Sequence, residues 1–167
     1  MVINLTIPSL VVNFFQVNTM STESHTSSVP MRVLNILLAE DDDLLRDIAA
    51  YMLKNLGHSG VLVVNGKQAL ECLAQRRFDV VMLDVMMPVM DGLAALAAIR
   101  KQEQQTGGHQ IVIMATSHSA PTDMARLLAA GADGYIAKPL LAATLQAELR
   151  RVMSFSGKRY PQKNTSL

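Results

Sequence analysis

Residues 80–92 of this chain read VVMLDVMMPVMDG, and this stretch decides the fold. Its first four residues are apolar and half of them are β-branched, which predicts a buried strand. Pro88 and the Asp91–Gly92 pair then predict a loop and a turn. Asp84 therefore closes a buried strand, where an ionised carboxylate serves no packing purpose and is costly to desolvate alone. Its position indicates a functional site.

Three other predicted strands also end in polar residues. They are residues 33–39 followed by Glu40 to Asp43, residues 111–115 followed by Thr116 and Ser117, and residues 134–137 followed by Lys138 and Pro139. A fifth strand is predicted at residues 61–64, and a helical pattern follows each of the five. The first of these helices has Leu44, Leu45, Ile48 and Leu53 on one apolar side.

Five alternating strand and helix patterns predict an α/β domain, with a parallel sheet covered by helices on both faces. Right-handed crossovers restrict the topology, and we expect a doubly wound five-stranded sheet in the order 2-1-3-4-5. In that order the first and third strands are neighbours, and sites lie outside the carboxyl ends of the strands. Glu40 and Asp41 should therefore lie beside Asp84, with Thr116 and Lys138 next along the same edge.

Length and composition limit the possible functions. A chain of 167 residues, 50% hydrophobic and 17% charged, is expected to form one globular domain. The net charge of +1 gives no general attraction to nucleic acid or to anionic membranes. Cys72 is the single cysteine, so an intramolecular disulfide is excluded, and its apolar setting favours a buried, inert thiol. With no export signal, the protein is expected to be cytoplasmic.

We expect three regions along the chain. Residues 1–30 form an N-terminal extension that is expected to be disordered, because Pro8 and polar residues interrupt its apolar patches and residues 18–30 are rich in Ser and Thr. The extension is too short and too polar to span a bilayer, although a docking or weak membrane-surface role stays open. Residues 31–155 form the folded domain, and residues 156–167 form a disordered tail.

The predicted site suits phosphoryl chemistry. Consecutive acids after the first strand repel free anions and attract a hard divalent cation, for which Mg²⁺ is the best candidate. Helix capping is the alternative explanation, and both hold if Asp42 and Asp43 cap while Glu40 and Asp41 belong to the strand end. With a metal neutralising the acids, Asp84 can attack phosphorus and form an acyl phosphate.

The stretch from about residue 32 to residue 152 resembles the receiver domain of response regulators, the phosphoacceptor module of two-component signalling. The matching motifs are ILLAEDD at 36–42, DVMMPVMDG at 84–92, ATS at 115–117 and GADGYIAKP at 131–139. They occur in the family's order, and the chain looks most like receivers fused to hybrid histidine kinases. The resemblance implies the flavodoxin-like receiver fold.

The resemblance also implies residue roles. Asp84 would be the phosphoacceptor. Glu40 and Asp41 would be the acid pair, which holds Mg²⁺ together with Asp84 and the backbone carbonyl of Met86. Thr116 and Lys138 would sense the phosphate, Tyr135 would be the aromatic switch, and Met86 and His118 would tune dephosphorylation. A cis peptide is implied at Lys138–Pro139.

The implied function is a phosphoacceptor that receives a phosphoryl group from a histidine kinase or a histidine phosphotransfer protein and signals to an effector protein by a conformational switch. It would be no enzyme beyond its own phosphorylation and dephosphorylation, and neither direct nucleic-acid binding nor a membrane span is expected. A dehalogenase-like phosphohydrolase would need an Asp where Met86 stands. A receiver-shaped interaction module that signals without phosphorylation is the remaining alternative, although Asp84, Asp41 and Lys138 are all present.

Overall fold

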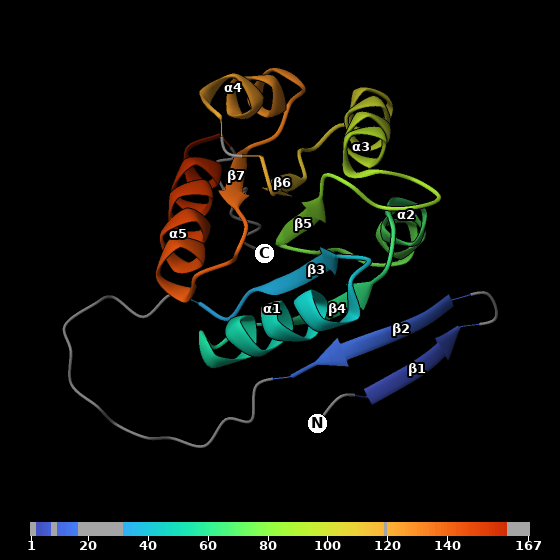
Figure 1. Ribbon diagram of the computed structural model, residues 1–167. Helices are drawn as coiled ribbons and strands as arrows, with labels where there is room; N and C mark the ends of the chain where they lie inside the picture. The colour runs from blue at the N-terminus through green and yellow to red at the C-terminus, as the bar shows by residue number, and fades with distance from the viewer. Residues whose placement is uncertain (1–2, 8–9, 17–31, 119, 160–167) are drawn as a thin grey trace, which may run out of the picture.

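The computed structural model describes residues 3–7, 10–16, 32–118 and 120–159, and Figure 1 shows their arrangement. The strands are β1 Ile3–Ile7, β2 Leu10–Phe15, β3 Asn35–Ala39, β4 Ser59–Val63, β5 Val80–Asp84, β6 Ile111–Thr116 and β7 Gly134–Ala137. The helices are α1 Asp43–Asn55, α2 Gly66–Gln75, α3 Gly92–Thr106, α4 Pro121–Ala129 and α5 Ala142–Arg159.

One sheet runs through the molecule in the order β1-β2-β4-β3-β5-β6-β7. The five strands β4, β3, β5, β6 and β7 are parallel. When these five are numbered by their order along the chain, their order in the sheet is 2-1-3-4-5. The predicted doubly wound fold is therefore confirmed. Leu38 of β3 lies opposite Met82 of β5, which lies opposite Ile113 of β6, so β3 and β5 are neighbours and their carboxyl ends meet.

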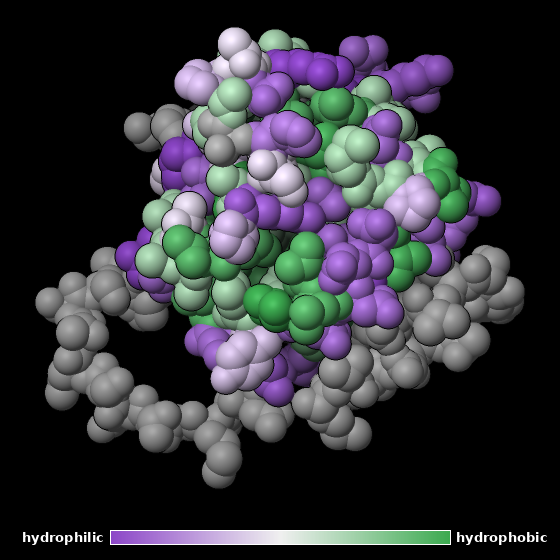
Figure 2. All heavy atoms as spheres, viewed as in Figure 1, coloured by the Kyte–Doolittle hydropathy of each residue, from purple (hydrophilic) through white to green (hydrophobic). Residues whose placement is uncertain are grey.

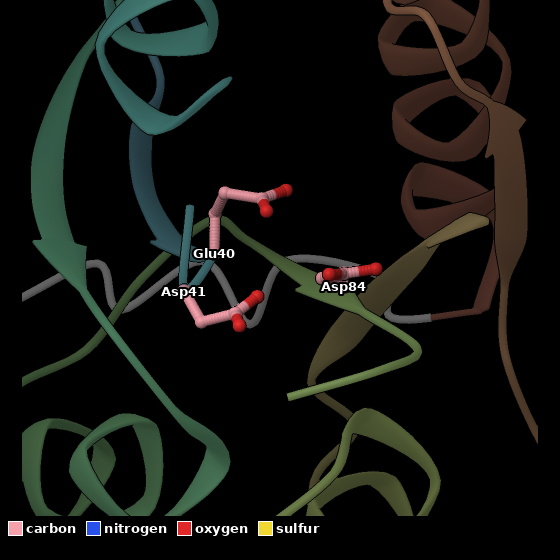
Figure 3. Close-up of side chains that lie close together, drawn as sticks. All are labelled: Glu40, Asp41 and Asp84. Atoms are coloured by element: carbon pink, nitrogen blue, oxygen red, sulfur yellow. The ribbon is translucent and has the colours of Figure 1, made fainter. Parts of the chain in front are cut away.

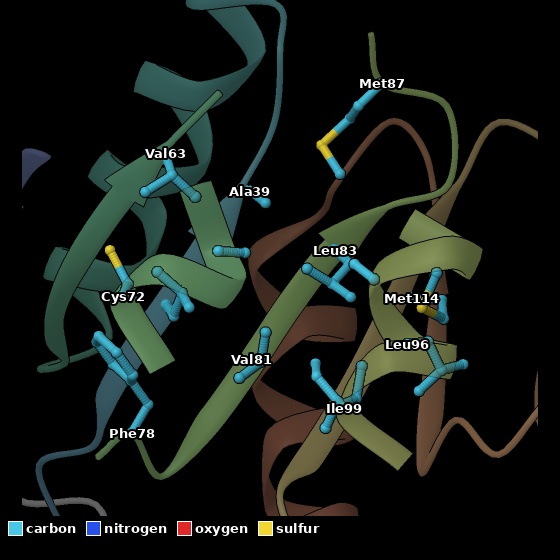
Figure 4. Close-up of a cluster of buried hydrophobic side chains, with 14 of the residues drawn as sticks. Ala39, Val63, Cys72, Phe78, Val81, Leu83, Met87, Leu96, Ile99 and Met114 are labelled. Carbon is cyan, nitrogen blue, oxygen red and sulfur yellow. The ribbon is translucent and has the colours of Figure 1, made fainter. Parts of the chain in front are cut away.

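The apolar strands fill two cores, one on each face of the sheet. Figure 4 shows the core in which Val81 and Leu83 of β5 pack against α2 and α3. The opposite face buries Leu53 of α1 and Leu145 of α5. Cys72 of α2 lies in the first core, where burial raises the pKa of its thiol to about 11, as suits an inert core thiol.

The α1 helix buries only part of the apolar side that the sequence predicted. Ala49 and Ala50 face the sheet together with Leu53, whereas Leu44 is 69% exposed and Ile48 is 40% exposed. Both alanines are buried in the core on this face of the sheet. The larger side chains of α1 are left at the surface.

The N-terminal region differs from the expected disordered extension. The β1–β2 hairpin continues the sheet, and β2 runs antiparallel to β4 with Phe14 opposite Val61. Phe15 is 3% exposed and lies in the core with Leu62. The hairpin satisfies backbone groups that would otherwise form an open edge at β4. Residues 17–31 and 160–167 lie outside the described part of the chain, and α5 continues to Arg159, past the expected boundary at residue 155.

Among the described residues, no helix combines the length and the apolar character that crossing a membrane requires.

Candidate functional site

Three carboxylates meet where β3 and β5 end. Glu40 and Asp41 follow β3 directly, and Asp84 is the last residue of β5. One ligand atom from each of the three lies within 4.8 Å of the others, and Figure 3 shows the three side chains near one another at these strand ends. Glu40 and Asp84 are buried, whereas Asp41 is exposed. The predicted meeting of these acids is therefore present in the structure.

Lys138 bridges two of these acids from the other side. Its Nζ lies 2.6 Å from Oε2 of Glu40 and 3.0 Å from Oδ2 of Asp84. The backbone N–H of Lys138 donates to the carbonyl of Thr116 at 2.8 Å, which continues the β6–β7 pairing past the strand end. The Lys138–Pro139 peptide is cis, as the resemblance implied.

Burial and charge shift the protonation of this group. Burial raises the pKa of Glu40, and the Asp84 charge adds to that effect against the opposing bond from Lys138. Burial alone would lower the pKa of the Lys138 ammonium, but its contacts with Glu40 and Asp84 outweigh burial and raise it. Lys138 therefore stays charged. When all three acids are ionised, they exceed the single ammonium by two negative charges.

The backbone around Asp84 is held closely by its neighbours. A Cβ at position 92 would lie 2.1 Å from the carbonyl oxygen of Asp84, so only glycine fits where α3 begins. Val85 N–H donates to the carbonyl of Ala115 at 2.9 Å, and Gly92 N–H donates to that of Val85 at 3.1 Å. The loop after Asp84 is thus fixed to both β6 and α3.

A three-residue turn shapes the rest of that loop. Met90 N–H donates to the carbonyl of Pro88 at 2.7 Å, and Val89 between them has φ 69°. The carbonyl of Met90 then accepts from Gly66 N–H at 2.9 Å, which ties the turn to the start of α2. A β-branched residue rarely adopts positive φ, so Val89 is a strained position.

The four consecutive acids divide their roles at the start of α1. Asp42 caps the helix, because its side chain accepts from Leu45 N–H at 2.9 Å. Asp43 is the first helical residue and pairs with Arg46. Glu40 and Asp41 remain at the strand end, as the sequence predicted. Sequence reasoning missed Arg46, which donates to the backbone carbonyl of Glu40 at 2.9 Å; its only signal was a cation three residues after an acid.

The predicted switch residues lie further along the same edge. The Thr116 hydroxyl accepts from His118 N–H at 3.0 Å and is 3.2 Å from the His118 carbonyl, to which it donates. A cavity of about 220 Å³ lies beside this turn, and its lining includes Thr116, His118 and Met86. Tyr135 is half-buried and packs against the core on the α2 and α3 side. The structure therefore brings Thr116, His118 and Met86 together around one cavity.

The donor set fits a hard divalent cation. All three grouped side chains offer carboxylate oxygens, and the exposed Asp41 leaves one side open to water or to a phosphoryl oxygen. The same acids repel free anions unless a cation is bound. Asp84, with Lys138 beside it, can act as a carboxylate nucleophile once that charge is offset.

Comparisons with known proteins agree on one family. Residues 36–150 match the family described as Response regulator receiver domain. The transcriptional regulatory protein AfsQ1 of Streptomyces coelicolor is 33% identical over 119 residues, and hybrid signal transduction histidine kinase I of Dictyostelium discoideum is 31% identical over 122 residues. These alignments cover 71% and 70% of this chain, but 51% and 7% of the two relatives. The chain thus spans about half the length of the first relative and a small part of the second.

Solved structures agree with this assignment. The chemotaxis response regulator CheY4 of Vibrio cholerae is 31% identical with a TM-score of 0.65, over 72% of this chain and 98% of that one. The receiver domain of a Pseudomonas aeruginosa sensor histidine kinase is 34% identical with a TM-score of 0.66, over 73% and 98%. That receiver was solved with a magnesium ion coordinated in its active-site cleft.

Proposed function

This chain belongs to the response-regulator receiver family, and from that premise we propose that Asp84 accepts a phosphoryl group from a histidine kinase or a histidine phosphotransfer protein. One observation carries the proposal: a buried carboxylate ends β5 with the ammonium of Lys138 3.0 Å away and two further acids beside it. The family assignment also supports the cytoplasmic location expected from the sequence.

The reaction requires little covalent chemistry from the protein. A carboxylate oxygen of Asp84 bonds to phosphorus while the bond from phosphorus to the donor imidazole nitrogen breaks, and that nitrogen keeps the electron pair. The product is an acyl phosphate on Asp84. Lys138 orients the carboxylate beforehand and supplies a positive charge for the phosphoryl oxygens afterwards. The protein's contribution is therefore positioning and charge.

We place Mg²⁺ at the acid group, held by Asp41, Asp84, Glu40 and the backbone carbonyl of Met86. The close grouping of the three carboxylates supports this assignment, as does the magnesium in the related Pseudomonas receiver. When bound, Mg²⁺ would neutralise the acids and the phosphoryl oxygens. The resemblance to receiver domains supports Asp41 as a direct ligand of the ion.

The signal would leave through Thr116 and Tyr135. A phosphoryl group brings a charge of about −2 to Asp84, within the same strand-end edge as the Thr116 hydroxyl. That hydroxyl now closes a turn with the His118 backbone, so bonding to the phosphoryl group requires it to leave this turn. The change would reshape the cavity beside Thr116 and bias Tyr135 toward one side-chain position. A downstream effector would read that face.

The surface of α1 supports a protein as the phosphodonor. Leu44, Leu45, Ile48 and Tyr51 are exposed, and in the view of Figure 2 apolar side chains gather on the face where α1 lies. This helix begins immediately after the acids, so a protein that places a phosphohistidine at Asp84 would cover its first turns. An apolar patch beside a charged site suits such a transient partner.

Labelling with acetyl phosphate and Mg²⁺ tests the proposal. Wild-type protein should gain one phosphoryl group that alkali and hydroxylamine remove, and Asp84→Asn should gain none. Asp91→Asn is a matched control, because Asp91 lies in the same loop but caps α3 through Ala94 N–H, a role that asparagine also performs. Full labelling of Asp84→Asn, or no labelling of wild type, would refute the assignment. The second result would favour the interaction module that signals without phosphorylation.

A further inference from the structure

Arg46 is a buried cation whose role the phosphoacceptor chemistry does not explain. It lies in the first half of α1 and is 7% exposed. Its Nη1 donates to the backbone carbonyl of Glu40 at 2.9 Å and contacts that of Asp41 at 3.4 Å, while its Nη2 bonds to the Asp43 carboxylate. One guanidinium thus holds the backbone of both acids at the end of β3.

The N-terminus of α1 does not need this arginine as a cap. Asp42 already caps α1 by accepting from Leu45 N–H at 2.9 Å. Burying a guanidinium is costly unless its donors are satisfied, and an ordinary arginine on this helix would point into water. Its acceptors are the Asp43 carboxylate and the backbone carbonyls of the two residues, Glu40 and Asp41, whose side chains form the acid pair. The arrangement therefore constrains the acid pair.

We propose that Arg46 is a positioning residue for the divalent-cation site: it braces the Glu40–Asp41 backbone from inside the fold so that the carboxylates stay turned toward Asp84. This inference rests on the proposed function, because it presumes that a cation binds there. The planar fork of arginine reaches two carbonyls and a carboxylate at once, which the single ammonium of lysine cannot reproduce. Partners that orient metal ligands commonly contribute 10- to 100-fold to metal affinity.

The charge of Arg46 acts on affinity in the opposite direction. A positive charge near the site repels a divalent cation, so removal of that charge alone favours binding. Two variants separate the two effects. Arg46→Lys keeps the charge and loses the fork, whereas Arg46→Gln loses both. If bracing dominates, both variants bind Mg²⁺ about tenfold or more weakly, with the lysine variant at least as weak as the glutamine variant.

The experiment is a Mg²⁺ titration of the full chain by isothermal titration calorimetry. It is repeated with Mn²⁺, whose binding is followed by electron paramagnetic resonance. Arg100→Gln is the matched control, because Arg100 is also largely buried and ion-paired, with Nη2 2.8 Å from Asp133 Oδ2, but lies near the residues that precede β6 and β7. It should lower stability and leave the Mg²⁺ dissociation constant unchanged. All titrations are made well below each variant's Tm, so that loss of folding cannot imitate loss of binding.

The outcomes assign failure to one inference or the other. Weaker binding in both Arg46 variants, with wild-type affinity in Arg100→Gln, supports the brace. Wild-type affinity in Arg46→Lys, or tighter binding in Arg46→Gln, overturns it. If Asp41→Ala binds Mg²⁺ as tightly as wild type does, the cation site itself is misassigned, and the proposed function fails rather than the role of Arg46.

Discussion

Replacing Val89 by glycine should stabilise this protein, although glycine usually destabilises. Val89 is held at φ 69° by the turn from Pro88 to Met90, within the loop that follows Asp84. Its side chain is 80% exposed, so removing it sacrifices little buried apolar surface. The substitution therefore tests backbone strain with almost no change in packing.

The expected magnitude follows from two opposing terms. A left-handed conformation costs an L-residue about 1–2 kcal/mol, and a β-branched side chain lies toward the upper end of that range. Glycine removes this strain but adds about 0.5–1 kcal/mol of conformational entropy to the unfolded chain. The net gain should be about 1 kcal/mol, which corresponds to a rise in Tm of about 2–4 °C for a chain of this size.

Urea unfolding followed by circular dichroism measures the effect. Val33→Gly is the control, because Val33 is 58% exposed and is not among the residues with positive φ. It should lose about 0.5–1 kcal/mol. Equal losses in Val33→Gly and Val89→Gly would show that Val89 carries no strain, and the description of the turn as strained would be wrong.

Three further predictions concern the metal, the pH dependence and the lifetime of the phosphoryl group. Mg²⁺ at 100 times its dissociation constant should add about 2.7 kcal/mol to the unfolding free energy; chelation should remove this gain, and a full gain in Asp41→Ala would contradict the site. Burial lowers the pKa of His58 below its ordinary 6.5, so near and below that pH the unfolded state binds a proton that the folded state does not. The free energy of unfolding should therefore fall as pH drops below 6.5, by up to about 1.4 kcal/mol per pH unit. A His58→Gln variant with the wild-type pH slope would exclude His58 as the cause. Met86→Asn and His118→Asn should each speed loss of the phosphoryl group, since an amide can orient an attacking water, and each tenfold change corresponds to about 1.4 kcal/mol; unchanged decay in both, timed after donor removal, would oppose their assignment.

The acid site could be predicted because it breaks a pattern. Asp84 interrupts an apolar run, and the rule that parallel strands end at one edge converts positions in sequence into neighbours in space. The same rule predicts that Glu40 and Lys138 are neighbours. They lie 98 residues apart in the chain, and Nζ of Lys138 is 2.6 Å from Oε2 of Glu40 in the fold. No rule of this kind gives side-chain directions, so the turn that Thr116 makes with His118 was not predictable.

The N-terminal hairpin was missed for a different reason. Residues 3–7 read INLTI, which alternates as a half-buried strand does, but the interrupting polar residues and Pro8 predicted a disordered extension instead. Whether such a segment becomes a strand depends on an open edge elsewhere in the fold. The edge of β4 provides it, and Phe15 adds a buried anchor beside Leu62. The decisive information is therefore non-local.

Arg46 was hidden because it fits a pattern rather than breaking one. An Asp and an Arg three residues apart on a helix predict an exposed ion pair of little energetic weight. In the fold, the side chain of Asp43 is 89% exposed and that of Arg46 is 9% exposed, so the ion pair joins an exposed carboxylate to a buried guanidinium. Arg46 lies on the buried side of α1 with Ala49 and Ala50, and its Nη1 donates to the strand-end carbonyl of Glu40. An ion-pair pattern in the sequence does not reveal which side of the helix is buried, and that side decides whether the guanidinium reaches the carbonyls of the acid pair.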